Sequence, residues 1–364
     1  MQNMIIRLAS VIAMVFLCGM PSAICKEPGY TPKIPPGYRS QVVLHVDYGT
    51  TPDKIRMLLP ERGEHYDHLS VSGLRVMGDK FYFIDDTVHT IKRYLSPGTF
   101  VWETEPLLNL HYFDVAPDGK VYAAWGTMVD RLSCIDGAGK LLWTIGYTDI
   151  LSKEKVKELG LHESYGNFGW VDWTVHGLSI ALNGLDEENN PKSVAVLLDK
   201  DGRFVRGLPG SVVGSDGTIY SYDIGKGRER FPSLRIIAKD LHGKALREIL
   251  PDFGAGKGVC PAGNPGFSRM RFDPTGAFAV RGTPLLATRI PLTSFLQGSK
   301  LEEILWRFGP HGNLTEEWRF LGSQFASRHP GIVMAPDGCV YHLNFGEKGI
   351  DVVKYSRPGK GGKP

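Results

Sequence analysis

Three histidines in this chain could bind one metal ion together. His68, His111 and His329 each stand just before a short apolar segment, in the sequences YDHLSV, LHYFDV and RHPGIV. Imidazole nitrogens are common ligands of Zn²⁺, and three protein ligands leave one coordination position open for water or substrate. If the three segments lie side by side, the histidines predict a metal-dependent lyase or hydrolase with a divalent ion such as Zn or Ca.

A simpler interpretation is that these histidines are polar residues of a solvated region, because histidines far apart in sequence are weak indicators of a metal site. Arg269, Arg271 and Arg328 belong to similar segments and predict attraction of an anionic ligand. Salt bridges to nearby carboxylates are the alternative for these arginines. The candidate ligand-binding residues are His68, His111, Arg269, Arg328 and His329.

The adjacent carboxylates Asp85 and Asp86 are a second chemical possibility, because paired acids can serve as general acid and base. The alternative is that one of them braces a turn to the next strand. The chain has no Gly-x-Ser-x-Gly nucleophile motif, no Cys-His spacing typical of structural zinc and no dinucleotide-binding fingerprint. The sequence therefore names no catalytic residue.

A repeated phrase indicates which elements must position these residues. Apolar residues flank an Asp-Gly or similar turn in six places. Asp and Gly accept turn geometry that most residues resist, and the alternating apolar residues supply strands, so each copy predicts a β-hairpin. The copies are residues 77–82, 116–122, 175–180, 215–220, 273–278 and 335–341.

A second hairpin phrase follows most copies, at 135–143, 198–205 and 239–246, with a looser version at 94–102. Two successive hairpins make a four-stranded antiparallel sheet, which is the blade of a β-propeller. Aligned copies recur 40, 58, 40, 59 and 62 residues apart, and the shorter intervals suit four short strands with tight turns. The longer intervals predict loops.

We expect these loops at 151–160, 252–266 and 311–325. In the first of them, Ser152 is a suitable N-cap for a short helix that Gly160 would end.

Both ends of the chain are expected to build the last blade. Residues 351–355 supply a third strand, but the following sequence GKGGKP cannot supply a fourth. Residues 41–46 provide that strand, which would close the ring and leave no open sheet edge. The prediction is therefore an all-β fold: a six-bladed β-propeller of four-stranded antiparallel blades, closed by an N-terminal strand. It would be one domain over residues 26–357, with a disordered tail at 358–364.

Two segments resemble a known repeat. The sequence HPGIVMAPDGCVY at 329–341 resembles the opening of an NHL repeat, and FDVAPDGKVY at 113–122 is similar. Asp85 or Asp86, followed by IKRY at 91–94, resembles the later part of that repeat. The resemblance implies a six-bladed fold that hosts binding proteins, lyases and hydrolases alike.

The amidating lyases among such propellers hold a histidine-ligated zinc in the central channel, but no motif here carries those ligands over. A competing resemblance is DGAGKLLW at 136–143, which is similar to the repeat of eight-bladed quinoprotein-like propellers. That motif is clear only once, and six copies do not fill eight blades.

The start of the chain predicts export. Residues 1–25 carry Arg7, an apolar stretch at 8–20 that is too short to span a bilayer, and small residues suited to cleavage. This pattern predicts a signal peptide and a secreted or periplasmic protein. A lipid anchor on Cys25 is disfavoured because the bulky Ile24 precedes it.

Cleavage would leave three cysteines, Cys134, Cys260 and Cys339, which can form one disulfide at most. Buried thiols are the favoured interpretation, and the pairing stays open.

The composition narrows the function classes. The 364 residues are 42% hydrophobic with a net charge of +3, which excludes a disordered or collagen-like chain and gives no reason to expect a nucleic-acid partner. In a propeller, the loops entering the innermost strands crowd one face around the channel mouth, and ligands are normally met there.

We therefore expect a binding or interaction module for a protein, peptide or glycan, with no membrane span and no certain cofactor. The histidine-metal enzyme is the alternative, and a structural subunit of an envelope complex is a third possibility.

Overall fold

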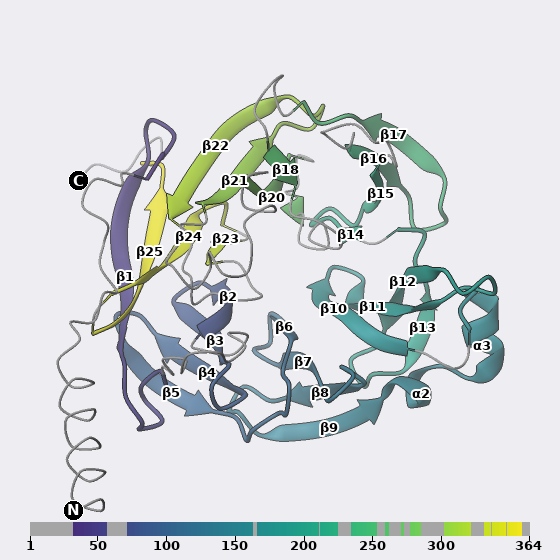
Figure 1. Cartoon of the computed structure of the whole chain (residues 1–364), viewed down its shortest axis with the longest axis horizontal. Coiled ribbons are helices and arrows are strands. Elements are labelled where there is room, and N and C mark those ends of the chain that lie inside the picture. Colours follow the sequence, from purple (N-terminus) through teal and green to yellow (C-terminus); the bar gives the residue numbers. More distant parts are fainter. Residues whose placement is uncertain are drawn as a thin grey trace, which may run out of the picture.

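The structure, a computed structural model, describes residues 32–56, 71–162, 166–210, 212–224, 234–252, 259–261, 271–272, 277–284, 302–321, 331–335, 337–346 and 348–358. Six antiparallel sheets stand around a ring, which confirms the predicted six-bladed β-propeller and shows the eight-bladed alternative to be wrong (Figure 1). The expected signal peptide lies outside the described residues, and so does the expected tail apart from Pro358.

Within each of the first three blades, the strands follow one another in chain order across the sheet. Blade 1 contains β2 (Val71–Met77), β3 (Lys80–Asp85), β4 (Thr90–Leu95) and β5 (Thr99–Glu103). Blade 2 contains β6 (Tyr112–Val115), β7 (Val121–Trp125), β8 (Arg131–Ile135) and β9 (Leu141–Gly146). Blade 3 contains β10 (Gly166–Thr174), β11 (Gly177–Leu185), β12 (Pro191–Leu198) and β13 (Phe204–Gly207).

Blade 4 keeps this order, whereas blade 5 has an extra short strand and blade 6 combines both ends of the chain. Blade 4 contains β14 (Val212–Val213), β15 (Ile219–Ile224), β16 (Leu234–Lys239) and β17 (Ala245–Ile249). Blade 5 contains β18 (Val259–Pro261), β19 (Arg271–Phe272), β20 (Phe278–Pro284), β21 (Glu302–Phe308) and β22 (Leu314–Leu321). Blade 6 contains β23 (Ile332–Met334), β24 (Val340–Phe345), β25 (Gly349–Ser356) and β1 (Arg39–Asp47).

The ring is closed by the N-terminal strand, as expected. Strand β1 pairs antiparallel with β25, and Val42 stands opposite Val353. Leu44 and Val46 of β1 are buried beside residues of blades 1 and 6, so the closing strand also contributes to the core. The two chain ends therefore stabilise each other through one sheet.

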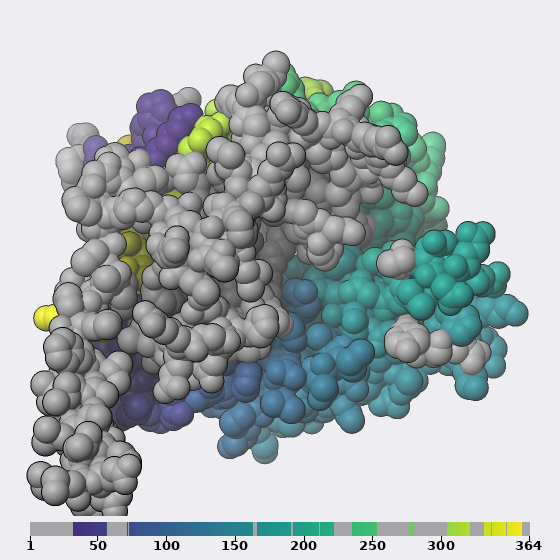
Figure 2. All heavy atoms as spheres, in the orientation of Figure 1, coloured from purple at the N-terminus to yellow at the C-terminus, as the bar shows by residue number. Residues whose placement is uncertain are grey.

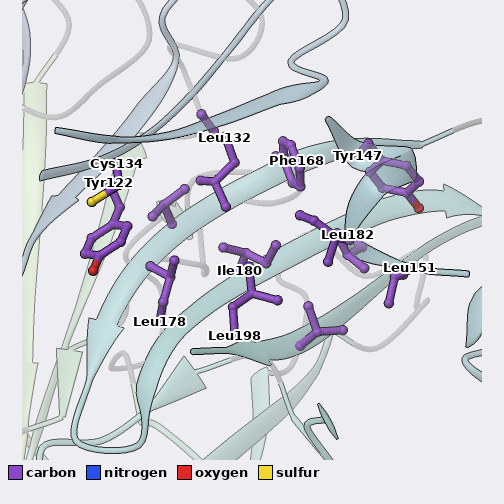
Figure 3. Packing of buried hydrophobic residues seen from close by; sticks show 14 of the residues in the cluster. Tyr122, Leu132, Cys134, Tyr147, Leu151, Phe168, Leu178, Ile180, Leu182 and Leu198 are labelled. Carbon is purple, nitrogen blue, oxygen red and sulfur yellow. The ribbon is translucent and has the colours of Figure 1, made fainter. Parts of the chain in front are cut away.

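Aromatic side chains at equivalent positions hold neighbouring blades together. The tyrosines that align in the repeat, Tyr82, Tyr122, Tyr220 and Tyr341, are all buried. In the packing between blades 2 and 3, Tyr122 lies with the apolar side chains of β10, β11 and β12 (Figure 3).

Tryptophans of the outer half of the blades also contact the neighbouring blades. Trp102 of blade 1 donates its Nε1 hydrogen to the carbonyl oxygen of Gly137 in blade 2, at 2.9 Å. Trp306 of blade 5 is buried in a cluster that includes Tyr220 and Ile236 of blade 4. These contacts leave the blades no independent cores.

The first predicted loop contains the expected helix. Helix α3 (Lys153–Glu158) begins after Ser152, whose side chain accepts a hydrogen bond from the backbone of Lys155. Gly160, at φ 66°, follows the helix and bonds back to Lys157. A shorter helix, α2 (Tyr147–Ile150), connects β9 to this segment.

The predictions for the other two loops were wrong in part. Residues 314–321 form β22, and residues 259–261 form β18. The long interval between repeat copies predicts a loop at 311–325, but residues 314–321 pair with β21 as a strand. Glu316 and Glu317 are nevertheless buried, because basic side chains pair with them: Arg357 with Glu316, at 2.8 Å, and Lys33 with Glu317, at 2.7 Å.

Both cysteines whose side chains are described are unpaired thiols. Cys134 is buried between blades 2 and 3. Burial raises the pKa of its thiol to about 11, so the group is protonated at neutral pH and is not a nucleophile. Cys339 is half-buried, and burial raises its pKa as well. The side chain of Cys260 lies outside the described residues.

Candidate ligand-binding site

Of the five candidate ligand-binding residues, the structure describes His111 alone; His68, Arg269, Arg328 and His329 lie outside the described residues. His111 stands directly before β6, where its backbone donates to the carbonyl oxygen of Ala124 at 3.1 Å. Whether the three histidines converge therefore stays a prediction. Over the described ranges, no group of three His, Cys, Asp or Glu side chains could hold a metal ion.

A cavity of about 170 Å³ opens where the innermost strands of four successive blades end. Blade 1 lines it with Leu74–Met77, blade 2 with Asp114, Val115 and Pro117, blade 3 with Trp173, and blade 6 with Val333–Ala335. Each contribution comes from the second half of an inner strand or from the turn after it. Propeller topology therefore assembles this cavity from segments more than two hundred residues apart in the chain.

The described lining is apolar except for one ion pair. The guanidinium Nε of Arg75 donates to Oδ1 of Asp114 at 2.8 Å, and the two side chains are 13% and 8% exposed. The other oxygen of Asp114, Oδ2, accepts from the backbone of Trp173 at 2.7 Å. One carboxylate thus connects the inner strands of blades 1, 2 and 3.

Arg75 lines the cavity and keeps unused donors. One Nη1 hydrogen goes to the carbonyl oxygen of Leu74, and the guanidinium lies over the ring of Phe113, with Cζ 5.4 Å from the ring centroid. A guanidinium has five N–H donors, and these contacts together with Asp114 use two. Nη2 makes no hydrogen bond to any residue in the described part of the chain.

Half-buried apolar side chains also line the cavity. Trp173 stacks on Tyr122, with ring centroids 5.2 Å apart and planes 15° apart. Val333 and Met77 are also half-buried and line the cavity. The arrangement offers one cluster of strong donors beside an apolar surface, which is typical of small-ligand sites.

This cavity lies at the opposite end of the inner strands from the loops that the sequence singled out. His111 precedes β6, whereas Asp114 and Val115 end it. Sequence reasoning missed Arg75 and Asp114, although a signal exists. Both pair across the sheet with an aligned repeat tyrosine, Arg75 with Tyr82 and Asp114 with Tyr122, so each places a charge in a strand that is otherwise uncharged.

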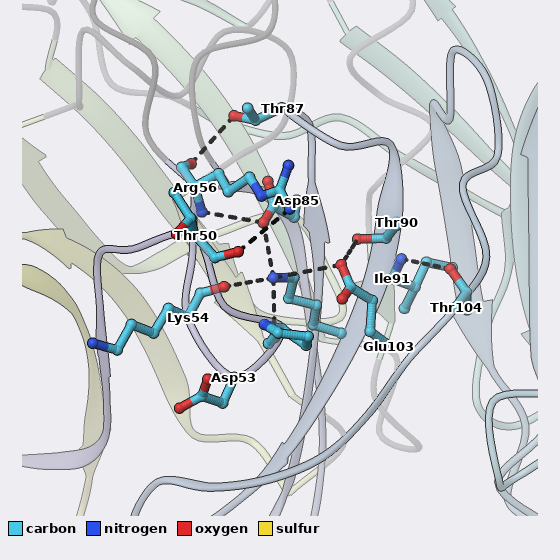
Figure 4. Close-up of polar contacts among 12 residues, drawn as sticks. Thr50, Asp53, Lys54, Arg56, Asp85, Thr87, Thr90, Ile91, Glu103 and Thr104 are labelled. Atoms are coloured by element: carbon cyan, nitrogen blue, oxygen red, sulfur yellow. Dashed lines mark hydrogen bonds and ion pairs between the residues drawn. The ribbon is translucent and has the colours of Figure 1, made fainter.

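The carboxylate of Asp85 takes part in a structural network. Asp85 and Asp86 are both buried, and Oδ2 of Asp85 lies 3.1 Å from Nζ of Lys92, whose side chain is 1% exposed. Lys92 also donates to the carbonyl oxygens of Pro52 and Lys54, at 3.1 and 2.5 Å (Figure 4). This network fastens the segment after β1 onto blade 1.

The protonation of Asp85 reflects its surroundings. Burial raises the pKa of this carboxyl, while the Lys92 ammonium and the backbone N–H of Arg56 oppose the rise. Its Oδ1 has no hydrogen-bond partner among the described residues. Asp85 is fully buried and is not part of the lining of the cavity described above.

None of the helices in the described part of the chain has the length and apolar character that a membrane crossing requires.

On the face drawn in Figure 2, the atoms of blades 1, 2 and 3 form an arc from blue to teal.

Comparisons with known proteins show no family for this chain. No protein-family model and no curated protein matches it. Among solved structures, the luciferin-regenerating enzyme is 12% identical, with a TM-score of 0.44 over 80% of this chain and 92% of its own. Regucalcin from Agrobacterium tumefaciens, a calcium-binding protein, is 12% identical, with a TM-score of 0.41 over 79% of this chain and 91% of its own.

A member of the DUF4221 family from Bacteroides vulgatus is 11% identical, with a TM-score of 0.41 over 88% of this chain and 99% of its own. At these identities and TM-scores, the likenesses assign no ligand and no activity to this propeller.

Proposed function

We propose that this chain is an exported, NHL-like propeller that acts as a binding module. It receives a small ligand, or one group of a protein, peptide or glycan partner, in the cavity at the end of the channel. The observation that carries the proposal is the lining of that cavity: an apolar wall from four blades around Arg75, which keeps unused donors. Histidines and arginines at the other end of the channel would contact a larger partner.

A rigid wall supports binding rather than catalysis. Asp114 uses both carboxylate oxygens to hold Arg75 and the backbone of Trp173, so it is occupied as a brace and is not placed as a general base. Arg75 is fixed in turn, which lowers the entropy lost when a ligand binds.

Methionine methyl groups provide a test of this site. Met77 and Met334 line the cavity, whereas Met128 is exposed on the turn between β7 and β8 and is not part of the lining. With ¹³C-methyl-labelled methionine, titration with benzyl alcohol, benzamide, benzoate and benzylamine should shift the NMR signals of Met77 and Met334 for at least one compound, with Met128 unmoved. If none of the four moves either cavity methyl, the proposed site is wrong.

A cavity-filling variant sharpens the test. Val333→Phe adds a ring to the lining without touching the ion pair, and it should abolish the shifts. The matched control is Val205→Phe on β13, at an exposed position outside the cavity lining, which should leave them unchanged.

Export is tested separately, by expressing the full chain and determining the N-terminus of the product by mass spectrometry. A mature chain that begins near Lys26 in the periplasm or medium supports the proposed export. A chain that keeps residues 1–25 in the cytoplasm contradicts it.

A separate experiment tests the metal-dependent alternative. It requires a near-stoichiometric divalent ion that is lost on chelation and lost again when His68, His111 and His329 are replaced. Metal analysis of the purified protein, with its melting temperature before and after chelation, decides that alternative.

A further inference from the structure

Resting on the proposed ligand site, we propose that the cavity selects an uncharged group about the size of one ring, which presents an oxygen acceptor to Arg75. The nearby guanidinium suggests at first that the ligand is an anion. The ion pair with Asp114 argues against that reading.

The charge of Arg75 is already balanced. Asp114 accepts its Nε hydrogen at 2.8 Å, and both side chains are largely shielded from water. The described lining contains no other charged side chain, so its net charge is zero. An anion bound at Nη2 would be the second negative charge on one guanidinium, in surroundings that solvate charge poorly.

A neutral acceptor avoids that penalty and can still bind the unused N–H groups of Arg75. Three of the five guanidinium hydrogens remain after the bonds to Asp114 and Leu74, and they need acceptors when a ligand displaces water. A carbonyl or hydroxyl oxygen accepts such bonds without adding a charge. A cation is excluded more strongly, because it would meet Arg75 directly and Asp114 has both oxygens engaged.

The volume sets the size of the group. The cavity measures about 170 Å³. An apolar cavity of roughly 150 Å³ holds a benzene molecule. Trp173 and the apolar side chains of β23 would contact the body of the ligand while Arg75 holds its oxygen.

Asp114 is then the residue that determines selectivity. Both of its oxygens are engaged, by Arg75 and by the backbone of Trp173, so it acts on the ligand as a positioning residue whose negative charge sets the preference. Removing that charge should leave Arg75 as an uncompensated cation and turn the cavity toward anions.

The decisive measurement compares benzamide with benzoate, which share size and shape and differ in charge. Their dissociation constants follow from the Met77 and Met334 shifts at pH 7 in wild-type protein. We expect benzamide to bind at least about tenfold more tightly than benzoate, because like charges placed together are strongly unfavourable at an interface.

Two variants test the cause. Asp114→Asn should reverse the preference, so that benzoate binds more tightly than benzamide. The matched control, Glu248→Gln, removes an exposed carboxylate that pairs with Arg235 on the surface of blade 4 and should leave the preference unchanged.

The outcomes separate the two proposals. If benzoate binds as tightly as benzamide or more tightly in wild-type protein, the selectivity is wrong and the ligand site stands. If benzylamine alone moves the cavity methyls, the selectivity is wrong and the ligand site stands. If none of the four compounds moves them, both proposals fail. The comparison of benzamide with benzoate in wild-type protein needs no substitution. It can therefore refute the proposal even if the Asp114→Asn variant does not fold.

Discussion

His342 shows how a single buried side chain couples this fold to pH. Its ring is buried in β24 and stacks on Phe320, with centroids 4.3 Å apart. Burial lowers the pKa of the imidazole from 6.5 to about 3. The folded protein therefore keeps His342 neutral at pH values where the unfolded chain would bind a proton.

This predicts a loss of stability in mild acid. The unfolded histidine gains a proton as the pH falls below 6.5, while the folded one does not until about 3. The contribution of His342 to the free energy of unfolding is therefore fully retained above pH 6.5. Between pH 7 and pH 5, the free energy of unfolding should fall by about 2 kcal/mol because of this residue alone. Urea denaturation of wild type and His342→Phe at both pH values measures it. Equal pH dependence in the two proteins would contradict the assignment.

The turns between the second and third strands show how one backbone geometry serves different blades. Val129 in blade 2 and Asn189 in blade 3 both adopt positive φ, at 54° and 62°. Each closes its turn through a backbone hydrogen bond, to Gly126 and to Asp186 respectively. A β-branched residue resists this conformation, whereas asparagine tolerates it. Val129 packs against the core between blades 2 and 3, which offsets the strain.

Asn189 is exposed and has no such compensation. Asn189→Val should lower the free energy of unfolding by about 1 kcal/mol, because the left-handed conformation is costly for a branched side chain. Asn189→Gly should retain the wild-type stability. Glu187→Val, at an exposed site in the same turn, is the control and should change stability by less than about 0.5 kcal/mol. Equal losses for the two valine variants would show that backbone strain is not the cause.

At the scale of the whole molecule, closure of the ring depends on β1. From Leu44 onward its side chains alternate between the core and the surface: Leu44 and Val46 are 1% and 4% exposed, and His45 between them is exposed. A bulge between Val42 and Leu44 breaks this alternation, and Val42 is 54% exposed. The Lys92 network then fixes the chain just beyond this strand to blade 1. The contact between the last and first blades is therefore made by the N-terminal segment as well as by the blades themselves.

Two substitutions in this one strand test the role of closure. Leu44→Ala should lower the free energy of unfolding by about 2–5 kcal/mol, because it leaves a cavity in the core shared by blades 1 and 6. Val42→Ala should change it by less than about 0.5 kcal/mol. Equilibrium urea denaturation measures both, and similar effects of the two substitutions would contradict the buried, closing role of β1.

Much of this architecture could be predicted from local patterns. Asp136 illustrates why: its carboxylate accepts from the backbone of Ala138 and Lys140, and Gly139 takes positive φ, so the DGAGK sequence dictates its own turn. Such signals are local, and their repetition gave the number of blades. The strand β22 was missed because the long interval between repeat copies predicted a loop there. Its two glutamates, Glu316 and Glu317, are buried through pairs with basic side chains that are distant in the sequence.

The candidate cavity was beyond the reach of the same reasoning. Arg75, Asp114 and Trp173 lie far apart in sequence, and no repeat phrase relates their side chains. Local chemistry determined the hairpins, their number and the strand that closes the ring, because turn geometry and strand alternation are properties of neighbouring residues. Only the tertiary structure decided that a cation, its counter-ion and an apolar wall meet at one end of the channel, because that meeting depends on the rotation from each blade to the next.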